Sequence, residues 1–378
     1  MRPTVAEINL SAIIANVKAI QQKVAPAKIM AVVKADAYGH GVLEVSKTII
    51  DCGVRHLGVG IVEEGIELRQ AGITANITVL SGLFPHQASR FIKFDLDATV
   101  YDDAGLEAIR LAAREQNSRA KIHIKVDTGM GRVGIHWREA AAFVERATSL
   151  PEIEPVGLYT HFASADEIDK SFTWLQLARF NEIIEQLEAK SINIPLIHAA
   201  NSAAVLDMPE SYFNMVRPGL SLYGYYPSPE TGRTIALQPA LTLKTRVLYV
   251  KEIDKGDSVG YGRTFIAKEK TRIATMPVGY ADGYNRLLSN QEHVIIKGKK
   301  YPVAGVVSMD LLTVDIGRDD DIRAGDEVIL IGDGPDHSLS VEAIAKKSGT
   351  IPYEVTCWIS KRVPRVYKTG GSGNIENV

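Results

Sequence analysis

The sequence predicts an α/β barrel followed by a mainly β domain. Two observations carry this prediction. Short β-rich runs alternate with amphipathic segments over residues 1–234, and β runs divided by Gly, Asp and Lys follow from residue 235 onward. Strands that alternate with helices form parallel sheets, and eight such strands can close into a (β/α)8 barrel resembling the TIM barrel. An open doubly wound sheet is the alternative that this pattern leaves.

The first helix is expected from Ser11 to about Val24, with Ser11 near the N-cap and Pro26 ending the helix. Eight β-rich runs follow, at residues 29–33, 56–60, 77–80, 97–100, 121–126, 155–159, 194–198 and 213–216. The amphipathic segments between them lie at residues 42–51, 61–71, 86–94, 103–116, 137–149 and 172–190.

The second domain is expected to consist mainly of strands, with one helix near residues 341–347. Its β runs are residues 241–250, 272–276, 293–297, 303–307 and 327–331. The segment 226–233 has the Pro, Ser and Gly content of a linker. We therefore expect a barrel over 1–234, a β domain over 235–368 and a disordered tail over 369–378.

Composition excludes several classes of protein. The chain has 378 residues, 46% hydrophobic and 23% charged, with a net charge of −2, so neither nucleic acid nor an anionic membrane is an expected partner. Cys52 and Cys357 lie far apart and do not indicate a disulfide framework. We find no apolar segment typical of a signal peptide or a membrane span, and expect a cytoplasmic protein.

Residues 29–41 are the most informative segment. Lys34 follows an apolar, β-branched run and is expected at the end of a buried strand. A polar loop with Tyr38 and His40 comes directly after it. A lysine at that position is either a solvated strand end or a desolvated amine. Desolvation lowers the pKa of an amine and makes it a nucleophile suited to Schiff-base chemistry.

Other unusual residues also follow the expected strands, where the active residues of such barrels lie. These segments are Asp127–Arg132, His161–Asp166, His198–Ser202 and Arg217–Ser221. Together with the segment that contains Lys34, these make five such segments on one rim, which are difficult to explain as loop caps alone.

The residue types on this rim suggest an anionic cofactor. Ser202 could present a hydroxyl and free backbone N–H groups to a phosphate, and Gly219 would allow close backbone approach. Arg132 and Arg217 are suited to a carboxylate or a ring acceptor. No nucleotide-binding loop is present. The histidines show no metal-ligand spacing, so we expect no metal. A phosphate site, a lysine and an aromatic-rich rim together suggest pyridoxal phosphate (PLP).

Several motifs resemble those of alanine racemases, the PLP-dependent barrel enzymes of bacteria, over nearly the whole chain. The motifs are Ala31–Gly41, Lys125–Arg132, His161–Asp166, Arg217–Gly219, Gly260–Gly262, Gly279–Gly283 and Ser308–Asp310. The resemblance implies that Lys34 holds PLP as a Schiff base and then acts as one of two catalytic bases. Tyr261, from the partner subunit of a head-to-tail homodimer, would be the other.

The resemblance also implies the roles of the residues around the cofactor. The phosphate would be held by the hydroxyls of Tyr38, Ser202 and Tyr353 and by backbone N–H groups of Ser202, Gly219 and Leu220. Arg217 would face the pyridine nitrogen. Tyr261, His161 and Arg217 would form a hydrogen-bonded chain.

Further residues would serve the substrate. Arg132 and the backbone of Met309 would hold the substrate carboxylate. Lys125 matches a position that is often carbamylated in the family, and an unmodified lysine paired with Asp127 or another nearby carboxylate is the alternative. Asp166, Tyr280 and Ile351 match positions lining the entrance. Val306 stands where the family commonly has arginine, so the expected entrance salt bridge would be absent.

The expected activity is interconversion of L- and D-alanine, which supplies D-alanine for bacterial peptidoglycan. Tyr353 and Met309 should crowd the substrate side chain and favour alanine. A racemase of serine or another small amino acid is the nearest alternative. A PLP decarboxylase on the related fold is more distant, because Arg217 and Tyr261 argue against it. A single-domain PLP carrier is also more distant, because the second domain and its Tyr261 argue against it.

Overall fold

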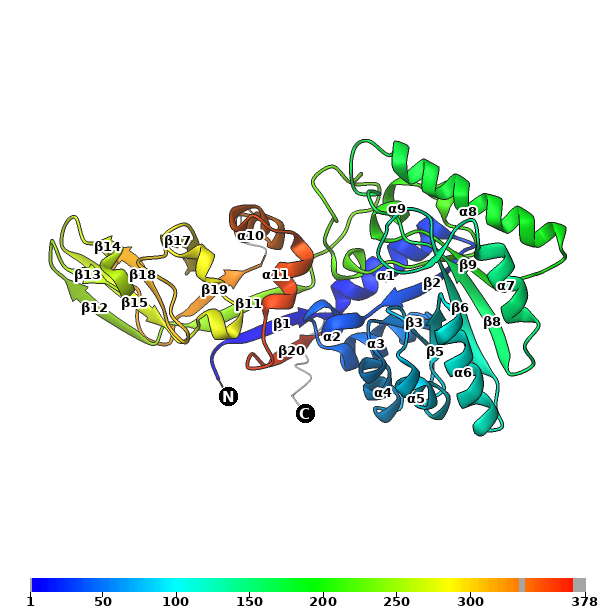
Figure 1. Cartoon of the computed structure of the whole chain (residues 1–378). Coiled ribbons are helices and arrows are strands. Elements are labelled where there is room, and N and C mark those ends of the chain that lie inside the picture. The colour runs from blue at the N-terminus through cyan, green and yellow to red at the C-terminus, as the bar shows by residue number, and fades with distance from the viewer. Residues whose placement is uncertain (1, 333–336, 370–378) are drawn as a thin grey trace. The chain divides into compact units, whose positions relative to one another are not determined.

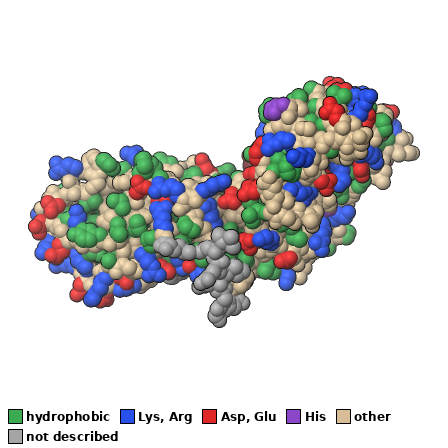
Figure 2. Space-filling model, turned by 90° about the horizontal axis from the view of Figure 1, so that it is seen from below, with side chains coloured by type: hydrophobic (Ala, Val, Ile, Leu, Met, Phe, Trp, Pro, Cys, Tyr) green, Lys and Arg blue, Asp and Glu red, His purple; other side chains and the backbone are tan. Residues whose placement is uncertain are grey.

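The computed structural model describes residues 2–332 and 337–369 of the chain. The expected disordered tail lies, from residue 370 onward, outside the described residues. Within the described part, no helix is both long and apolar enough to cross a bilayer. Basic and acidic side chains are interspersed over the face shown in Figure 2.

The chain divides into two compact units. The barrel unit contains residues 13–37 and 42–237. The β unit contains residues 1–12, residues 38–41 and the chain from residue 238 onward.

Eight parallel strands form the barrel (Figure 1). Their pairing runs β2-β3-β4-β5-β6-β8-β9-β10, and β10 pairs back with β2. The strands are β2 (Lys28–Val32), β3 (His56–Val59), β4 (Asn76–Val79), β5 (Asp97–Val100), β6 (Ala120–Asp127), β8 (Ile153–Tyr159), β9 (Leu196–His198) and β10 (Met215–Val216). The closed barrel is therefore confirmed, since the alternative doubly wound sheet would leave two unpaired edges.

The strands read as continuous apolar runs because both of their faces are covered. All four residues of β5 are buried, as are the last four of β2. Parallel strands in barrels pack helices on one face and the core on the other. The covering helices are α1 (Leu10–Val24), α3 (Val42–Asp51), α4 (Val62–Gln70), α5 (Ala88–Lys93), α6 (Asp103–Glu115), α7 (Ala140–Thr148), α8 (Ser171–Ala189) and α9 (Ser202–Asp207).

The start of the first helix differs from the expectation. Helix α1 begins at Leu10, and the Oδ1 atom of Asn9 accepts a hydrogen bond of 3.1 Å from the backbone N–H of Ala12. Asn9, rather than Ser11, therefore caps the helix, because its amide oxygen reaches one of the free N–H groups of the first turn.

The β unit contains three sheets. Its largest has the order β17-β16-β19-β11-β1-β20, and the others are β12-β15-β18 and the hairpin β13-β14. The strands are β1 (Val5–Asn9), β11 (Leu241–Arg246), β12 (Tyr249–Ile253), β13 (Ser258–Val259), β14 (Phe265–Ile266), β15 (Thr271–Met276), β16 (His293–Ile296), β17 (Lys299–Pro302), β18 (Leu312–Gly317), β19 (Glu327–Ile331) and β20 (Arg365–Lys368). Helices α10 (Val341–Ser348) and α11 (Pro352–Trp358) complete the unit.

The N-terminal strand does not belong to the barrel unit, although the expected barrel began at residue 1. Strand β1 pairs antiparallel with β11 and parallel with β20. Ala6 and Ile8 are buried and alternate with less buried neighbours, as in a strand with one face on a core. The chain therefore starts in the β unit and then enters the barrel unit.

Two expected strands of the second domain are also different. The run 241–250 is divided between β11 and β12. The run 303–307 contributes only an isolated bridge from Val303 to Val314. Gly305 has a φ of +89°, and a Cβ there would lie 2.8 Å from the carbonyl oxygen of Val259, so a close backbone approach interrupts that run.

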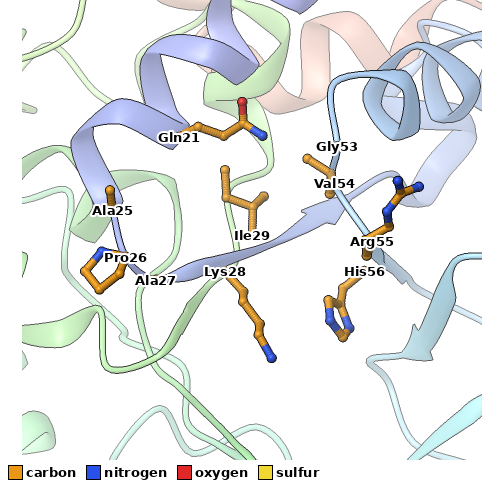
Figure 3. Close-up of a pocket in the computed structure, with 10 residues that line it drawn as sticks. All are labelled: Gln21, Ala25, Pro26, Ala27, Lys28, Ile29, Gly53, Val54, Arg55 and His56. Atoms are coloured by element: carbon orange, nitrogen blue, oxygen red, sulfur yellow. The ribbon is translucent and has the colours of Figure 1, made fainter.

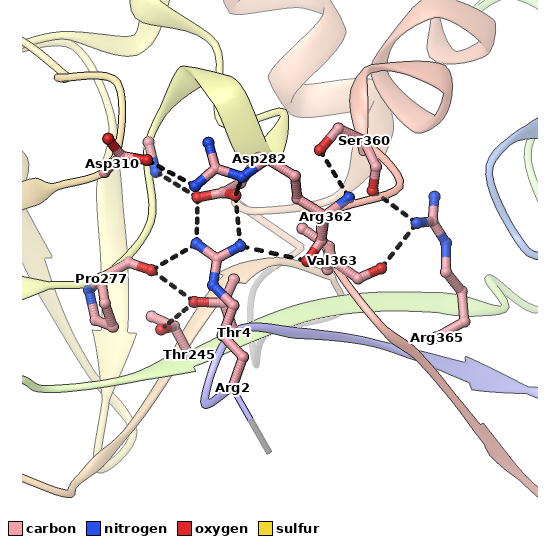
Figure 4. Close-up of polar contacts among 11 residues, drawn as sticks. Arg2, Thr4, Thr245, Pro277, Asp282, Asp310, Ser360, Arg362, Val363 and Arg365 are labelled. Carbon is pink, nitrogen blue, oxygen red and sulfur yellow. Dashed lines mark hydrogen bonds and ion pairs between the residues drawn. The ribbon is translucent and has the colours of Figure 1, made fainter. Parts of the chain in front are cut away.

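A buried carboxylate holds several loops of the β unit together (Figure 4). Asp282 accepts two hydrogen bonds of 2.6 Å from the guanidinium of Arg2 and one of 3.1 Å from the N–H of Gly279. Arg362 lies 3.5 Å from the same carboxylate and donates to Asp310. Asp282 therefore links the N-terminus to the loops that carry residues 279–283 and 308–310.

We predict that Asp282→Asn lowers the free energy of unfolding of the protein by about 2–4 kcal/mol, because it leaves the Arg2 guanidinium without its bidentate acceptor. Asp310→Asn is the matched control. Asp310 is exposed and, among the described residues, its carboxylate bonds only the half-exposed Arg362, so its loss should cost at most about 1 kcal/mol. Urea denaturation measures both, and equal costs would contradict this account.

Candidate active site

Lys34 opens an unusual turn at the carboxyl end of β2. The segment α2 (Lys34–Tyr38) follows the strand directly, and Ala35 to Tyr38 all have φ between +52° and +54°. The expected loop is therefore a left-handed turn, which costs about 1–2 kcal/mol per L-residue. Such strain persists only where the surroundings hold it in place. The Lys34 side chain is exposed in the chain as described.

Glu64, in the first turn of α4, stabilises this turn. Its carboxylate accepts hydrogen bonds of 2.7 Å from the N–H of Ala35, 2.7 Å from Gly60 and 3.3 Å from Ile61. One side chain therefore fixes both the residue after Lys34 and the first turn of α4. Sequence reasoning missed Glu64, although a glutamate at the third position of a helix is a known capping signal.

Arg217 is the buried centre of the barrel rim. Its Nη1 atom donates to Nδ1 of His198 (2.9 Å) and to the carbonyl of His198 (2.8 Å). Its Nη2 atom donates to the carbonyls of Thr160 (2.6 Å) and Ala199 (3.0 Å), with Nδ1 of His161 at 3.4 Å. Among the described residues these bonds use only the terminal nitrogens, so the Nε–H group remains available for a ring acceptor.

Tyr159 forms an aromatic surface beside Arg217. Its ring stacks on His198 at 4.9 Å, with the Arg217 guanidinium 5.0 Å and the Lys125 ammonium 5.5 Å from the ring centroid. The hydroxyl donates to the carbonyl of Leu80, and burial raises its pKa to about 12. Tyr159 therefore stays a neutral phenol. Sequence reasoning missed it, since a tyrosine ending a strand is usually a packing residue.

Burial and positive charge lower the pKa values of three other groups on the rim. Burial, Arg132 and Arg217 lower the pKa of Lys125 to about 7. Burial and Arg217 lower the pKa of His161, and likewise that of His198, well below the usual value. Both imidazoles are therefore neutral at pH 7, and about half of the Lys125 amine is unprotonated there.

The loop after β6 carries the other predicted arginine. Asp127 accepts hydrogen bonds from the N–H groups of Gly129 (2.9 Å) and Gly131 (3.1 Å), and Arg132 follows with an exposed side chain. Within the part of the chain that the structure describes, Lys125 and Asp127 form no ion pair. The carboxylate of Asp127 therefore shapes the loop.

Ser202 forms a small polar cradle with the segment after β10. Its hydroxyl oxygen lies 2.9 Å from the N–H of Gly219, 3.3 Å from the N–H of Ser221 and 3.2 Å from the Ser221 hydroxyl. Leu220 is fully buried between them. Several donors thus converge on one point at the barrel rim, as an anionic oxygen requires.

The β unit holds the remaining predicted phosphate ligands. Tyr38 belongs to this unit, and its ring centroid lies 6.0 Å from that of Tyr353 on α11. Ile351 precedes α11 and is exposed. The two tyrosines, more than 300 residues apart in sequence, are therefore neighbours, as a shared ligand would require.

Two glycines flank Tyr261, and its side chain is exposed. It opens the short turn Tyr261–Arg263 between β13 and β14, and its residue is 73% exposed. Gly260 and Gly262 have φ of +75° and +70°, which other residues seldom adopt. The Gly-Tyr-Gly motif therefore produces an outward-facing tyrosine suited to contact with another molecule.

Met309 and Tyr280 lie on adjoining loops of the β unit. The N–H of Tyr280 donates to the carbonyl of Ser308 (3.0 Å), and the N–H of Ala281 donates to that of Met309 (3.1 Å). A Cβ at Gly279 would lie 2.2 Å from the carbonyl oxygen of Ser308, so only glycine fits there. Both Met309 and Tyr280 are exposed, and Val306 is partly buried in the same unit.

Asp166 lies in the barrel unit, in the loop after β8. Its carbonyl accepts a hydrogen bond of 2.6 Å from the hydroxyl of Ser228, and its side chain is partly exposed. The described residues contain no group of three or more His, Cys, Asp or Glu side chains placed to hold a metal.

A pocket of about 480 Å³ lies at the other end of the barrel strands (Figure 3). It is lined by residues at the starts of β2 and β3, among them Lys28, Arg55 and His56. In Figure 3, Lys28 and His56 point to the same side. Lys34 follows the opposite end of β2, so this pocket is separate from the candidate active site.

Comparisons with known proteins agree with this geometry. Residues 8–227 match the family model "Alanine racemase, N-terminal domain", and residues 240–367 match "Alanine racemase, C-terminal domain". An alanine racemase of Halothermothrix orenii is 48% identical over 369 residues, covering 97% of each chain. An alanine racemase structure from Clostridium difficile 630 has a TM-score of 0.95 at 39% identity, covering 99% of this chain and 97% of that one.

A second similar structure contains a bound ligand. The alanine racemase from Bacillus anthracis with bound L-Ala-P has a TM-score of 0.93 at 37% identity, covering 100% of this chain and 97% of that one.

We predict that Glu64→Gln loosens the Lys34 turn without unfolding the barrel. Loss of a charge-assisted acceptor costs about 1.5–3 kcal/mol locally, so amide exchange at Ala35 should accelerate at least about tenfold. Hydrogen–deuterium exchange of peptides covering residues 33–37 measures this. Glu63→Gln is the matched control, because Glu63 pairs with Arg90 and is exposed. Equal exchange in the two variants would refute the assignment.

Proposed function

The chain belongs to the alanine racemase family, whose members are isomerases, and we propose that it interconverts L- and D-alanine with PLP held at Lys34. The observation that carries the cofactor assignment is the set of donors at Arg217. Its terminal nitrogens are engaged by the protein, while no described residue accepts a hydrogen bond from its Nε–H group. A pyridine nitrogen is the acceptor that such a donor suits.

The residues present fit PLP in other respects. The cradle of Ser202, Gly219 and Ser221 offers convergent donors to a phosphate, with Tyr38 and Tyr353 as further hydroxyls. Lys34 supplies the amine for the Schiff base. When bound there, PLP would acidify the Cα proton of the amino acid by delocalising the negative charge.

The protein's own residues would then move protons. Lys34 would exchange the Cα proton on one face, and Tyr261 of a second subunit would exchange it on the other. A tyrosine is a poor base at its ordinary pKa of about 10, so it needs a partner, and the neutral imidazole of His161 beside Arg217 is proposed for that role. Arg132 and the N–H of Met309 would hold the substrate carboxylate.

Arg217 would also set the strength of the cofactor as an electron sink. A guanidinium is only a hydrogen-bond donor, so Arg217 would leave the pyridine nitrogen of PLP unprotonated. This would suit proton exchange at Cα better than decarboxylation, and it argues against the alternative of a PLP decarboxylase. A racemase of serine or another small amino acid is the nearer alternative. The proposed biological role is supply of D-alanine for peptidoglycan.

The shared site predicts a complementation result. Lys34→Ala and Tyr261→Phe should each reduce racemisation of alanine at least about a thousandfold, since each lacks one base. When the two variants are mixed, unfolded and refolded together, mixed dimers would contain one site with both bases. Chiral chromatography should then show activity returning to about a quarter of wild type, since half of the dimers have one intact site of two.

The same assay separates the alternatives. L-Ala, L-Ser, L-Lys and L-Arg are supplied in parallel, and D-alanine should form fastest. Absence of any recovery on mixing would contradict a site shared between subunits. Release of CO₂ without a D-amino acid would contradict racemisation altogether.

Lys125 is proposed to be carbamylated, which would orient Arg132. A carbamate forms from an unprotonated amine and CO₂, and the pKa of Lys125 is lowered to about 7. The unprotonated fraction therefore rises as the pH increases through 7. The neighbouring Arg132, Arg217 and Lys34, which disfavour the ammonium form, would favour the anionic product.

We predict a carbamate signal in ¹³C NMR of the protein in ¹³C-bicarbonate, falling by about threefold or more from pH 8 to pH 6 as the amine becomes protonated. Lys125→Met should abolish the signal. Lys121→Met is the control, since Lys121 pairs with exposed Asp95 and its pKa is raised. A signal that persists in Lys125→Met would assign it elsewhere.

A further inference from the structure

A row of buried polar side chains leads from Arg217 to a carboxylate near the opposite end of the barrel. Nη1 of Arg217 lies 2.9 Å from Nδ1 of His198, and Nε2 of His198 lies 3.0 Å from Nδ1 of His123. Nε2 of His123 lies 3.3 Å from the hydroxyl of Thr78 and 3.5 Å from the carboxylate of Asp97. These are contacts between β9, β6, β4 and β5.

The row crosses the barrel interior. His123 on β6 touches residues on β9 and β4, and neither strand is its neighbour in the sheet. Both histidines are fully buried, and Asp97 is 5% exposed. A Cβ at Gly157 would lie 1.9 Å from Nδ1 of His123, so the neighbouring strand leaves room for this ring only because it has glycine there.

From one end of the row, Arg217 favours a single direction for every bond. A guanidinium only donates, so Nδ1 of His198 must accept. A neutral His198 then carries its proton on Nε2 and donates to Nδ1 of His123. Consequently His123 carries its proton on Nε2 and must donate toward Thr78 and Asp97.

The two groups at that end are not equivalent. The Thr78 hydroxyl can donate or accept, so by itself it permits either tautomer of His123. A carboxylate can only accept, so Asp97 favours a proton on Nε2 of His123. Asp97 and Arg217 thus impose the same order of donors from the two ends of the row.

We propose that Asp97 is a positioning residue for Arg217, acting through His123 and His198 by fixing their tautomers. Its effect on catalysis rests on the proposed function, in which Arg217 contacts the cofactor ring. With the opposite tautomers, His198 would present an N–H to Nη1 of Arg217. Two donors would then face each other in a buried site, and the guanidinium would lose one of its acceptors.

Imidazole ¹⁵N NMR of the full-length protein tests the tautomers directly, with and without added PLP. The chain has nine histidines, and His123→Gln and His198→Gln assign the two signals. We expect both rings to be neutral with the proton on Nε2. A proton on Nδ1 of His198, or an imidazolium at either position, would overturn the proposal without any variant of Asp97.

Asp97→Asn then tests the carboxylate. The amide can donate to His123, so a second, Nδ1-protonated population of His123 and His198 should appear. Thr78→Val removes only the hydroxyl and should leave the Nε2 tautomer dominant. Asp95→Asn is the control for charge, because Asp95 is exposed and interacts with Lys121 and Arg69, which also sense Asp97. Unchanged tautomers in Asp97→Asn would overturn the proposal.

The consequence for activity is measured separately. We expect kcat for alanine to fall about tenfold in Asp97→Asn, as is typical for outer partners of an oriented imidazole, with KM changed less than about twofold. The absorbance maximum of bound PLP should shift, and Asp95→Asn should match wild type. An altered tautomer with unchanged kcat and absorbance would refute the positioning role. Absence of racemisation in wild type would refute the proposed function and leave the tautomer result intact.

Discussion

The buried guanidinium of Arg217 is the constraint on which the site depends. A group with five donors and no acceptor must be surrounded by acceptors, because a buried charge without partners is costly. Carbonyls of Thr160, His198 and Ala199 supply most of them. These carbonyls lie at or directly after the carboxyl ends of two neighbouring strands, β8 and β9, so the closed barrel itself positions the acceptors. Burial and this cation together lower the pKa values of His161 and His198, and both contribute to the lowered pKa of Lys125.

The two units carry different kinds of candidate site residue. The barrel rim supplies groups held by several buried bonds, as at Ser202 and Arg217. The β unit supplies side chains that are exposed in the chain as described, such as Tyr261 and Met309. Glycines and the Asp282 ion pair fix the backbone of the loops that carry these residues, while the side chains remain exposed. Such side chains are suited to contact with a second molecule.

Much of this arrangement could be predicted from the sequence, and the failures have physical causes. The barrel strands are continuous apolar runs, which local sequence reports well. Strand β1 was missed because its partners, β11 and β20, lie more than 230 residues away, and five residues give little periodicity. The start of α1 was predicted one residue too late, because the same Asn9 both ends β1 and caps the helix. The left-handed turn after Lys34 was missed because nothing in Ala35–Tyr38 requires a positive φ; the turn is held by Glu64.

The interior of the barrel explains why site residues are harder to predict than strands. His123, Thr78, Thr99 and Tyr159 replace apolar side chains in a core where Val and Ile usually pack. Each of these polar groups requires a partner on a strand that is not its neighbour, as His123 and Thr78 show. Sequence shows that such residues alternate inward, but it does not show which of them meet across the barrel. A polar core of this kind is less stabilising than an apolar one. The order of its hydrogen-bond donors is consistent only while Arg217 and Asp97, at the two ends of the row, keep their charges.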